Sequence, residues 1–249
     1  MKIETHILAY NGAEIFIYAA RHYITFSNRI ILHDLGSTDG TLDIAAQFGI
    51  EVRHWDCKNQ VNNLLLKQIK EQAWRGTDSD WIIVADTDEL IYFPKGAVDS
   101  FNSYSAQGLP VIKPHGFEMF SEMYPVTNGQ IYDEVKFGAR DDRWYAKPIV
   151  FSPRLVESIE FSAGAHECWA TPKSGAKFDN PTKHSEPPAY LLHFHHIHPI
   201  ERIAKDYDDC LARRSEEDIK NRWGNLDPGI KHARDKRAYI MSRLEKVIT

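Results

Sequence analysis

The sequence predicts an α/β fold with a mostly parallel central sheet, flanking helices and a helical C-terminal extension. Two observations carry this prediction. Four segments of strand character alternate with three of helical periodicity over the first 90 residues, an order typical of parallel sheets with right-handed crossovers. The last of these strands, Trp81–Ala85, is almost wholly apolar and rich in β-branched residues, as expected of a strand that is buried on both faces.

The first third of the chain alternates regularly between the two patterns. Residues 10–12 form a turn after the first strand, and Gly49 stands where a helix ending near Phe48 would be capped. The apolar face of the first helix consists of Ile15, Tyr18, Ala19, His22 and Phe26. The predicted strands are residues 3–9, 29–33, 50–55 and 81–85, and the predicted helices lie within 15–26, 41–48 and 61–73.

The pattern changes after Phe93. Residues 171–188 are rich in Pro, Lys and Ser and are predicted to form a surface loop. Pro199 is suited to open a helix, whose apolar face would be Ile200, Ile203, Ala204, Tyr207 and Leu211. The other predicted elements are strands at 110–120, 145–152 and 190–198 and helices at 97–105 and 228–247.

Composition narrows the class of protein. The chain has 249 residues and a net charge of −5, which suits one large domain or a core with an extension and gives no reason to expect a nucleic-acid partner. No apolar run approaches the roughly 18 residues needed to cross a membrane, and residues 1–6 lack the apolar stretch of a signal peptide. Cys57, Cys168 and Cys210 have no metal-type spacing. We therefore expect a reduced, cytoplasmic protein.

Acidic residues follow two of the predicted strands. Trp81–Ala85 runs directly into Asp86-Thr87-Asp88-Glu89, and the second strand ends at Asp34. We expect these two strands to be neighbours whose carboxyl ends face one crevice, where α/β proteins bind ligands and where carboxylates hold a divalent cation and its phosphates. An acidic turn that caps a helix is the structural alternative. The chain has no Gly-x-Gly-x-x-Gly after its first strand and no Walker motif.

Three motifs resemble those of glycosyltransferase family 2, whose members have the GT-A fold. Residues 34–41, Asp-Leu-Gly-Ser-Thr-Asp-Gly-Thr, are similar to the family's Asp-x-Gly-Ser-x-Asp-Gly-Thr loop. Asp86-Thr87-Asp88 matches its Asp-x-Asp motif. Asn11-Gly12-Ala13-Glu14 lies near its Asn-Glu position, with two residues between the pair. The resemblance is specific over residues 3–90.

The resemblance implies a metal-dependent glycosyltransferase that moves a sugar from a UDP-, GDP- or dTDP-sugar to an oligosaccharide or lipid-linked glycan. It implies a GT-A catalytic domain over residues 1–198, with a nucleotide-binding half (1–92) and an acceptor half (93–198), before a helical extension (199–249). Bound Mn²⁺ or Mg²⁺ would neutralise the leaving diphosphate.

The same resemblance assigns roles to particular residues. Asp88 is expected to bind the metal directly, and Asp86 through water or at the ribose. Asp34 is expected to contact the base, with Asp39 nearby. Tyr10 either packs on the base or belongs to the core. The other expected nucleotide contacts are Asn11, Glu14 and Lys147.

The stretch His193-Phe194-His195-His196-Ile197-His198 is unusual in its histidine content. On a strand, His193 and His195 would face the same side and share the metal or diphosphate, one of them as a further ligand. The spacing also fits a separate transition-metal site or an ordinary histidine-rich strand.

A transferase that inverts configuration needs a general base for the acceptor hydroxyl. Glu167 is the first candidate, followed by Asp141 and Asp142; a retaining enzyme would not need this role. Arg140 and Arg143 are further candidates for diphosphate or acceptor contacts; solvated surface charge is the alternative that the sequence favours for each residue alone.

Three other classes of protein are alternatives to a glycosyltransferase. A sugar-nucleotide nucleotidyltransferase would need a glycine-rich basic loop after the first strand, which residues 10–13 do not supply. A non-catalytic carbohydrate-binding relative would not need Asp86 and Asp88. A histidine-metal hydrolase would need further ligands, for which His166 and His184 are available. The basic final helix would allow weak peripheral contact with an anionic membrane, or it is a solvated face.

Overall fold

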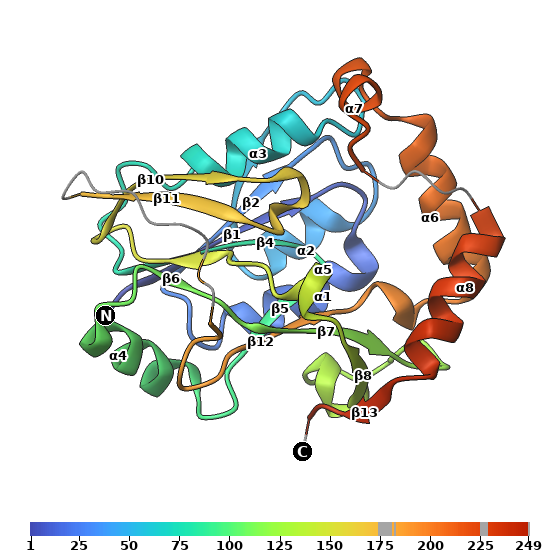
Figure 1. Ribbon diagram of the computed structural model, residues 1–249. Helices are drawn as coiled ribbons and strands as arrows, with labels where there is room; N and C mark the ends of the chain where they lie inside the picture. Colours follow the sequence, from blue (N-terminus) through green and yellow to red (C-terminus); the bar gives the residue numbers. More distant parts are fainter. Residues whose placement is uncertain (174–180, 182, 225–228, 249) are drawn as a thin grey trace.

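The computed structural model describes residues 1–173, 181, 183–224 and 229–248. Its central layer is a six-stranded sheet with the order β3-β2-β1-β4-β9-β6 (Figure 1). These strands are β1 (Ile3–Ala9), β2 (Arg29–Asp34), β3 (Glu51–His54), β4 (Trp81–Asp86), β6 (Val111–Ile112) and β9 (Val150–Phe151). β1 to β4 are mutually parallel, and β9 is antiparallel to both β4 and β6. The predicted α/β fold with a mostly parallel sheet is confirmed.

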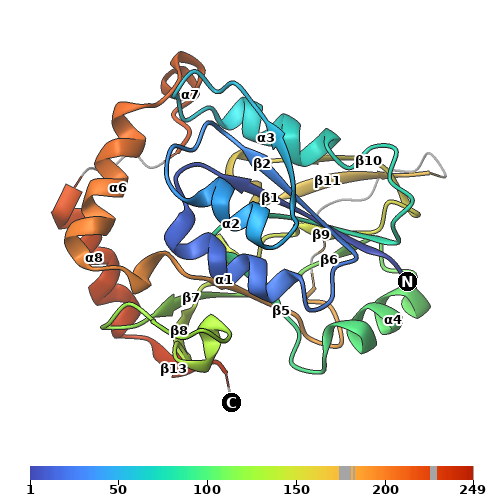
Figure 2. The ribbon, with the colours of Figure 1, turned by 180° about the vertical axis from the view of Figure 1, so that it is seen from behind.

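The helices between the parallel strands cover both faces of this sheet. α1 (Ala13–Tyr23) and α2 (Thr41–Gln47) pack together on one face, and α3 (Asn63–Gln72) lies on the other (Figure 2). This division follows from right-handed crossovers, because the chain moves from β1 outward to β3 and then returns past β1 to β4. The expectation that the second and fourth strands are neighbours is wrong, since β1 lies between them.

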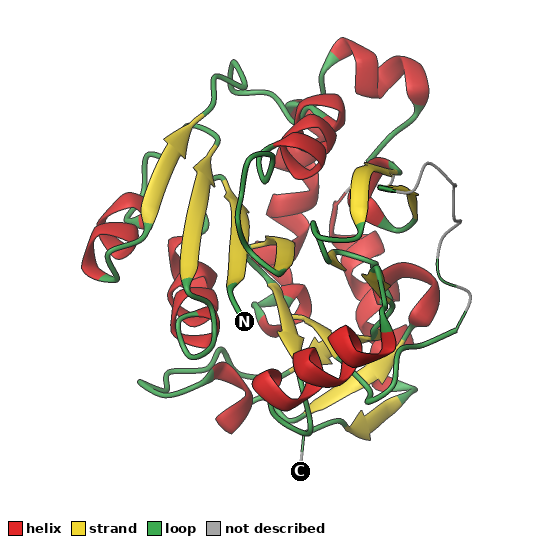
Figure 3. Ribbon diagram, turned by 90° about the vertical axis from the view of Figure 1, so that its left-hand side faces the viewer, coloured by secondary structure: helices red, strands yellow, loops and turns green. Residues whose placement is uncertain are grey.

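A second sheet has the order β13-β8-β7-β12-β5. Figure 3 shows its strands at a steep angle to those of the first sheet. β5 follows β4 after only Thr87 and Asp88, so the acidic motif is the corner at which the chain changes sheets. The strands are β5 (Glu89–Tyr92), β7 (His115–Phe120), β8 (Phe137–Arg140), β12 (Tyr190–His193) and β13 (Leu244–Lys246).

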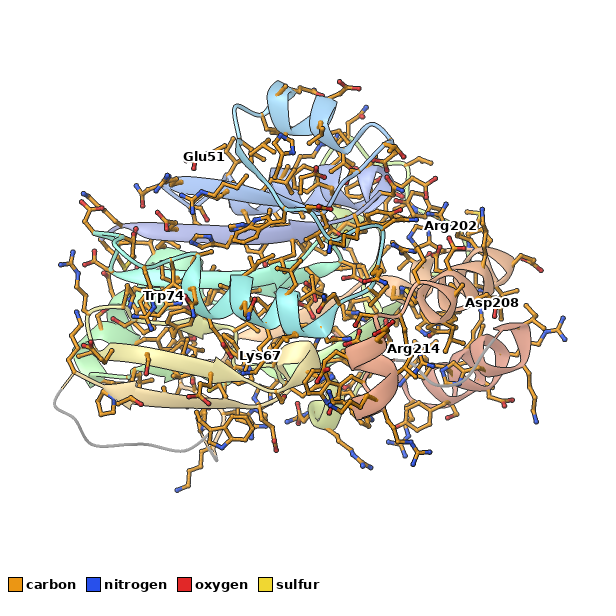
Figure 4. The ribbon with its side chains drawn as sticks, turned by 90° about the horizontal axis from the view of Figure 1, so that it is seen from above. Glu51, Lys67, Trp74, Arg202, Asp208 and Arg214 are labelled. Atoms are coloured by element: carbon orange, nitrogen blue, oxygen red, sulfur yellow. The ribbon has the colours of Figure 1, made fainter. Side chains whose placement is uncertain are left out.

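A two-stranded ribbon, β10 (Val156–Phe161) with β11 (Cys168–Pro172), packs beside α3. Trp74, just after α3, meets Phe151 of the first sheet edge-on, with 5.1 Å between the ring centroids. Figure 4 shows Trp74 and Lys67 on the α3 side of the ribbon. The remaining short elements are α4 (Ala97–Gln107), α5 (Asp142–Tyr145) and 3₁₀ turns at Ile131–Asp133, Ala163–Ala165 and His195–Ile197.

The C-terminal region is helical apart from β13. α6 (Ile200–Ala212) packs against α8 (Gly229–Met241) through Ile203, Ala204 and Ala233, and α7 (Glu216–Asn221) lies near α3. Figures 1 and 2 show α6 and α8 at the carboxyl ends of the parallel strands. In the described part of the chain, no helix combines the length and apolarity needed to cross a membrane.

Two predicted strands are interrupted by proline. The strand expected over 110–120 is split, because Pro114 stands between β6 in the first sheet and β7 in the second. The strand expected over 145–152 is reduced to Val150–Phe151: Tyr145 ends α5, and Pro148 has no N–H to pair.

Two other boundaries were wrong near the C-terminus. The strand expected over 190–198 ends at His193, which pairs with Glu89, the first residue of β5. β5 begins at Glu89 and does not extend past this pair, and residues 195–197 form a 3₁₀ turn. The helix expected to reach Val247 ends at Met241, because residues 244–246 pair with β8 instead. Within the loop predicted over 171–188, residues 174–180 and 182 lie outside the described residues.

Tyr23 provides a test of how α1 holds β5. Its buried hydroxyl donates to the Glu89 carbonyl (2.8 Å) and accepts from the Ile91 N–H (3.2 Å). We expect Tyr23→Phe to lower the free energy of unfolding by about 1–3 kcal/mol, because it leaves buried backbone groups unpaired. Urea unfolding measures this. Tyr239→Phe, at a side chain that is 37% exposed, is the control, and an equally small effect of both changes would contradict the assignment.

Candidate functional site

The candidate site lies where the strand order reverses, between β1 and β4. Neighbouring connections leave such a switch point in opposite directions and open a crevice at the carboxyl ends of the strands. The turn after β1 and the corner after β4 meet there. A Cβ on Gly12 would come within 3.2 Å of the Thr87 hydroxyl oxygen, so glycine allows this close approach. Two cavities open on either side of Tyr10, which lines both.

The first, the Trp55 cavity, has a volume of about 450 Å³ and lies over the ends of β1, β2 and β3. It is lined by Tyr10, Asp34, Leu35, Gly36, His54, Trp55, Asp56, Cys57, Lys58 and Asn59. Asp34 accepts hydrogen bonds from the N–H groups of Gly36 (3.3 Å) and Ser37 (3.0 Å), and His54 Nδ1 lies 3.1 Å from it. Burial acts to raise the pKa of Asp34, but these hydrogen bonds outweigh it and lower the pKa. Asp34 therefore shapes the loop as well as lining the cavity.

A chain of buried hydrogen bonds anchors Trp55. Its indole N–H, which can only donate, lies 2.9 Å from His33 Nδ1. His33 Nε2 lies 2.9 Å from His6 Nδ1, and His6 Nε2 lies 2.9 Å from Glu4. Burial lowers the pKa of His33 to about 3, so the ring is neutral and carries its proton on Nε2. Each group then donates to the next, from Trp55 through His33 and His6 to Glu4.

The second, the Asp88 cavity, has a volume of about 380 Å³ and lies between the switch point and α6. Tyr10, Asn11, Gly12, Thr87 and Asp88 form its sheet side. His195, His198 and one face of α6 form the other side, with Arg202, Lys205, Asp206, Asp209, Cys210 and Arg213. The Arg213 guanidinium stands 4.1 Å above the centre of the Tyr10 ring. Figure 4 shows Arg202 at the junction of α6 with the body of the molecule.

Asp88 is held by His193, the last residue of β12, and by His195 in the turn that follows. Its Oδ2 lies 3.3 Å from His193 Nε2 and 3.9 Å from His195 Nδ1. His193 Nδ1 contacts the buried Glu118 carboxylate of β7 at 2.9 Å. Burial acts to raise the pKa of Asp88, but the attraction of His193 outweighs it and lowers the pKa. Burial acts to lower the pKa of His193, but the attraction of Glu118 and Asp88 outweighs it and raises the pKa. The same interaction lowers the pKa of Glu118 to about 2.

These residues fit a divalent cation at Asp88. A metal-binding histidine usually donates its other ring N–H to a carboxylate, which is the relation between His193 Nδ1 and Glu118. His195 also points a ring nitrogen at Asp88, and its buried Nε2 has no hydrogen-bond partner among the described residues. His193 and His195 both lie beside the Asp88 carboxylate, but not as neighbours on one strand, because β12 ends at His193.

The two acids on either side of Asp88 in this stretch, Asp86 and Glu89, are paired with lysines. Lys70 of α3 contacts Asp86, with 2.9 Å between Nζ and Oδ1. Lys147 pairs with the buried Glu89; burial acts to lower the pKa of Lys147, but Glu89 and Asp86 outweigh it and raise it to about 12. Lys147, expected at the diphosphate, is thus buried against Glu89 and lines neither cavity.

Asn11 and Asp39 connect two loops. Asn11 Oδ1 accepts from the Thr38 N–H at 2.7 Å, and Asp39 accepts from the N–H groups of Ala13 and Thr41, each at 3.0 Å. These bonds fasten the loop after β2 to the start of α1. Glu14 lies on the α6 side, 3.6 Å from the Arg202 guanidinium.

The three acids considered as general bases lie elsewhere. Glu167 is exposed and lines a cavity with His166 and Trp144. Asp141 and Asp142 line another, of about 710 Å³, together with Arg140, Arg143, Trp144, His232, Asp235, Lys236, Tyr239 and Arg243. None of the three lines the Trp55 or Asp88 cavity. Tyr145 connects the cavity lined by Asp141 and Asp142 with the surroundings of Asp88. Its ring stacks on His193, with 4.5 Å between the centroids, and the Lys236 ammonium lies over the same ring, 5.5 Å from its centroid.

Sequence reasoning missed Trp55, Lys70, Glu118 and the polar face of α6. The α6 residues recur at helical spacing from Arg202 to Arg213, so their common face was visible. Nothing in the sequence indicated that this face covers the strand ends instead of facing water.

No model of a known protein family matches the chain, and no curated protein sequence matches it. Among solved structures, residues 1–349 of S. aureus TarS align with a TM-score of 0.46 and 14% identity over 88% of this chain and 68% of that one. Glucosyl-3-phosphoglycerate synthase from Mycobacterium tuberculosis, in complex with Mn²⁺, UDP and glucosyl-3-phosphoglycerate, aligns with a TM-score of 0.33 and 17% identity over 47% of this chain and 44% of that one.

Mannosyl-3-phosphoglycerate synthase from Rubrobacter xylanophilus aligns with a TM-score of 0.35 and 15% identity, over 51% of this chain and 43% of that one. The present chain therefore spans less than half of either synthase. With TM-scores below 0.5, these similarities assign neither a family nor an activity.

The buried histidine chain predicts a pH dependence. Burial lowers the pKa of His33 from 6.5 to about 3. Below pH 6.5 this histidine therefore binds a proton in the unfolded chain but not in the folded chain, and the free energy of unfolding decreases as the pH is lowered. The loss approaches about 1.4 kcal/mol per pH unit for one group. We expect His33→Phe to be less stable than the wild-type chain near pH 7, because the substitution removes the hydrogen-bond acceptor of Trp55. Between pH 7 and pH 5, however, the variant should lose less stability than the wild-type chain. Urea unfolding at both pH values measures this; parallel profiles would contradict it.

Proposed function

We propose that the chain is a metal-dependent glycosyltransferase that uses a nucleotide-diphosphate sugar, as the resemblance of its motifs to GT-A enzymes of glycosyltransferase family 2 implies. The observation that carries the proposal is the pair of cavities that share Tyr10 at the switch point. One offers an aromatic side chain and hydrogen-bonding groups, which suit a nucleobase and ribose. The other offers Asp88, neighbouring histidines and basic groups, which suit a diphosphate and its cation.

In the Trp55 cavity, the hydrogen-bonded chain to Glu4 holds Trp55 in one orientation. The indole supplies an aromatic face, and Asp34 and Asn59 supply acceptor oxygens. Tyr10 lies between base and diphosphate, fixed by its hydroxyl, which donates to Asn59 (2.7 Å), and by Arg213 above its ring.

In the Asp88 cavity, Arg202, Lys205 and Arg213 are balanced by four acids: Glu14, Asp88, Asp206 and Asp209. The lining therefore carries no excess of positive charge with which to neutralise a diphosphate. A divalent ion held by Asp88, with His193 or His195 as further donors, would supply that charge as the leaving group departs. Burial acts to raise the pKa of Asp88, but the positive charge of His193 outweighs it and lowers the pKa, so the carboxylate is ionised before an ion binds; the ion would take over that charge when a histidine becomes a donor.

We place the acceptor on the Tyr145 side. The cavity lined by Trp144 and Tyr239 offers exposed aromatic faces amid Arg140, Arg143 and Lys236, and Tyr145 separates it from His193 by one ring. Asp141 and Asp142 line this cavity and stay candidates for the base, as does Glu167 in the adjoining one. An oligosaccharide or lipid-linked glycan is the proposed acceptor class.

The first test is calorimetric titration of UDP, GDP and dTDP with and without Mn²⁺. We expect one nucleotide to bind the wild-type chain more tightly with Mn²⁺, and Asp88→Asn to lose that gain, by about tenfold or more (about 1.4 kcal/mol). Asp99→Asn, an acid of α4 that lines a remote cavity, is the matched control. Failure of all three nucleotides to bind would exclude the proposal.

A second variant separates the base from the metal. We expect Trp55→Ala to weaken nucleotide binding by the loss of base stacking, about 1–3 kcal/mol, and to keep the Mn²⁺-dependent gain. Trp169→Ala, at an exposed side chain of β11, should change neither quantity. Unaltered affinity in Trp55→Ala would place the base elsewhere.

A further inference from the structure

A third group of potential ligands lies outside the two cavities. His115 opens β7, Asp142 opens α5, and His184 belongs to the segment that leads to β12. One ligand atom of each lies within 4.8 Å of the others. His184 Nε2 is 3.4 Å from Asp142 Oδ2, and His115 Nδ1 is 4.0 Å from Asp142 Oδ1. These residues bring together three separate stretches of the chain.

Backbone hydrogen bonds orient two of these side chains. His184 Nδ1 lies 3.0 Å from the Pro114 carbonyl oxygen and can only donate to that acceptor, so Nε2, which faces Asp142, is the nitrogen left to bind a metal. The Gly116 N–H donates to Asp142 Oδ1 at 2.9 Å. Histidines bound to metals are typically oriented by such contacts from their second ring nitrogen.

Arg140 already places a positive charge among these groups. Its Nη2 lies 2.6 Å from His115 Nδ1 and 2.7 Å from Asp142 Oδ2. A guanidinium only donates hydrogen bonds, so His115 Nδ1 presents a lone pair. The Arg140 side chain is 47% exposed and can turn into solvent. A cation-binding position lined by two imidazole nitrogens and a carboxylate is therefore occupied by a side chain that can be displaced.

We propose that His115, Asp142 and His184 form a binding site for a transition-metal ion of the Zn²⁺ class, and that the ion displaces Arg140. Two nitrogens and one carboxylate oxygen suit Zn²⁺ and its neighbours. Mg²⁺ and Ca²⁺ prefer oxygen ligands. The site is distinct from Asp88, whose neighbours are His193 and His195.

The bound ion would fasten α5 and the segment before β12 to β7. These are the elements that carry Tyr145, His193 and Glu118. The site would therefore stabilise the frame around Asp88 without contacting the sugar nucleotide. The inference does not depend on the proposed transferase activity, but an ion bound to Asp142 would leave Asp141 and Glu167 as the candidates for its general base.

The test is a Zn²⁺ competition titration against a chromophoric chelator, with Co²⁺ absorption as a spectroscopic readout. It is made on full-length His193→Gln, in which the candidate site at Asp88 has lost one donor. We expect one equivalent of Zn²⁺ to remain bound. Adding His184→Ala or His115→Ala should weaken it at least about tenfold, because each removes a ligand. Adding Arg140→Gln should strengthen it, because the competing charge is gone.

Thermal unfolding supplies the folding control. Without metal, the variants should melt cooperatively, and Zn²⁺ should raise the melting temperature of His193→Gln but not that of His193→Gln with His184→Ala. Equal Zn²⁺ affinity with and without His184 and His115 would overturn the proposal. Weaker binding after Arg140→Gln would overturn the displacement of Arg140.

Discussion

The position of the candidate site follows from the right-handedness of strand crossovers. With that hand fixed, a chain that adds β2 and β3 on one side of β1 and then β4 on the other must place its helices on opposite faces. The connections at β1 and β4 then diverge, and the crevice opens at their carboxyl ends. Tyr10 and Asp88 lie at this crevice because they belong to the turns that directly follow those two strands, which end at Ala9 and Asp86.

The second sheet determines what surrounds Asp88. β5 begins immediately after it, and the antiparallel pairing of β5 with β12 places His193 opposite Glu89. β12 also pairs with β7, which places Glu118 opposite His193. A carboxylate, an imidazole and a second carboxylate are thus aligned across three strands. This alignment depends on register, because a shift of one residue would turn His193 to the other face.

Each acid around this corner contacts a basic side chain. Asp86 contacts Lys70, Glu89 contacts Lys147, and His193 serves both Asp88 and Glu118. Lys147 and Glu89 are both buried, and leaving one member of such a pair without its partner costs about 3–5 kcal/mol, so this pair constrains the position of the elements that carry it. Asp88 differs from the other acids in that it also lines an open cavity. It is therefore the acid of this group that is available to an added cation.

The sequence by itself determined the strand–helix alternation of the first 90 residues and the acids at the ends of β2 and β4, because burial pattern and turn chemistry are local properties. It also indicated that His193 and His195 lie close to each other, since they are only two residues apart. Tertiary structure alone decided that β1 separates β2 from β4, that α6 turns its polar face to the site, and that Lys147 forms an ion pair with Glu89. It also brought His115 to Asp142 and His184. These outcomes depend on which strands pair and at what register. Strand pairing is decided by interactions between residues that are far apart in the chain, and such interactions leave no periodic pattern in the sequence.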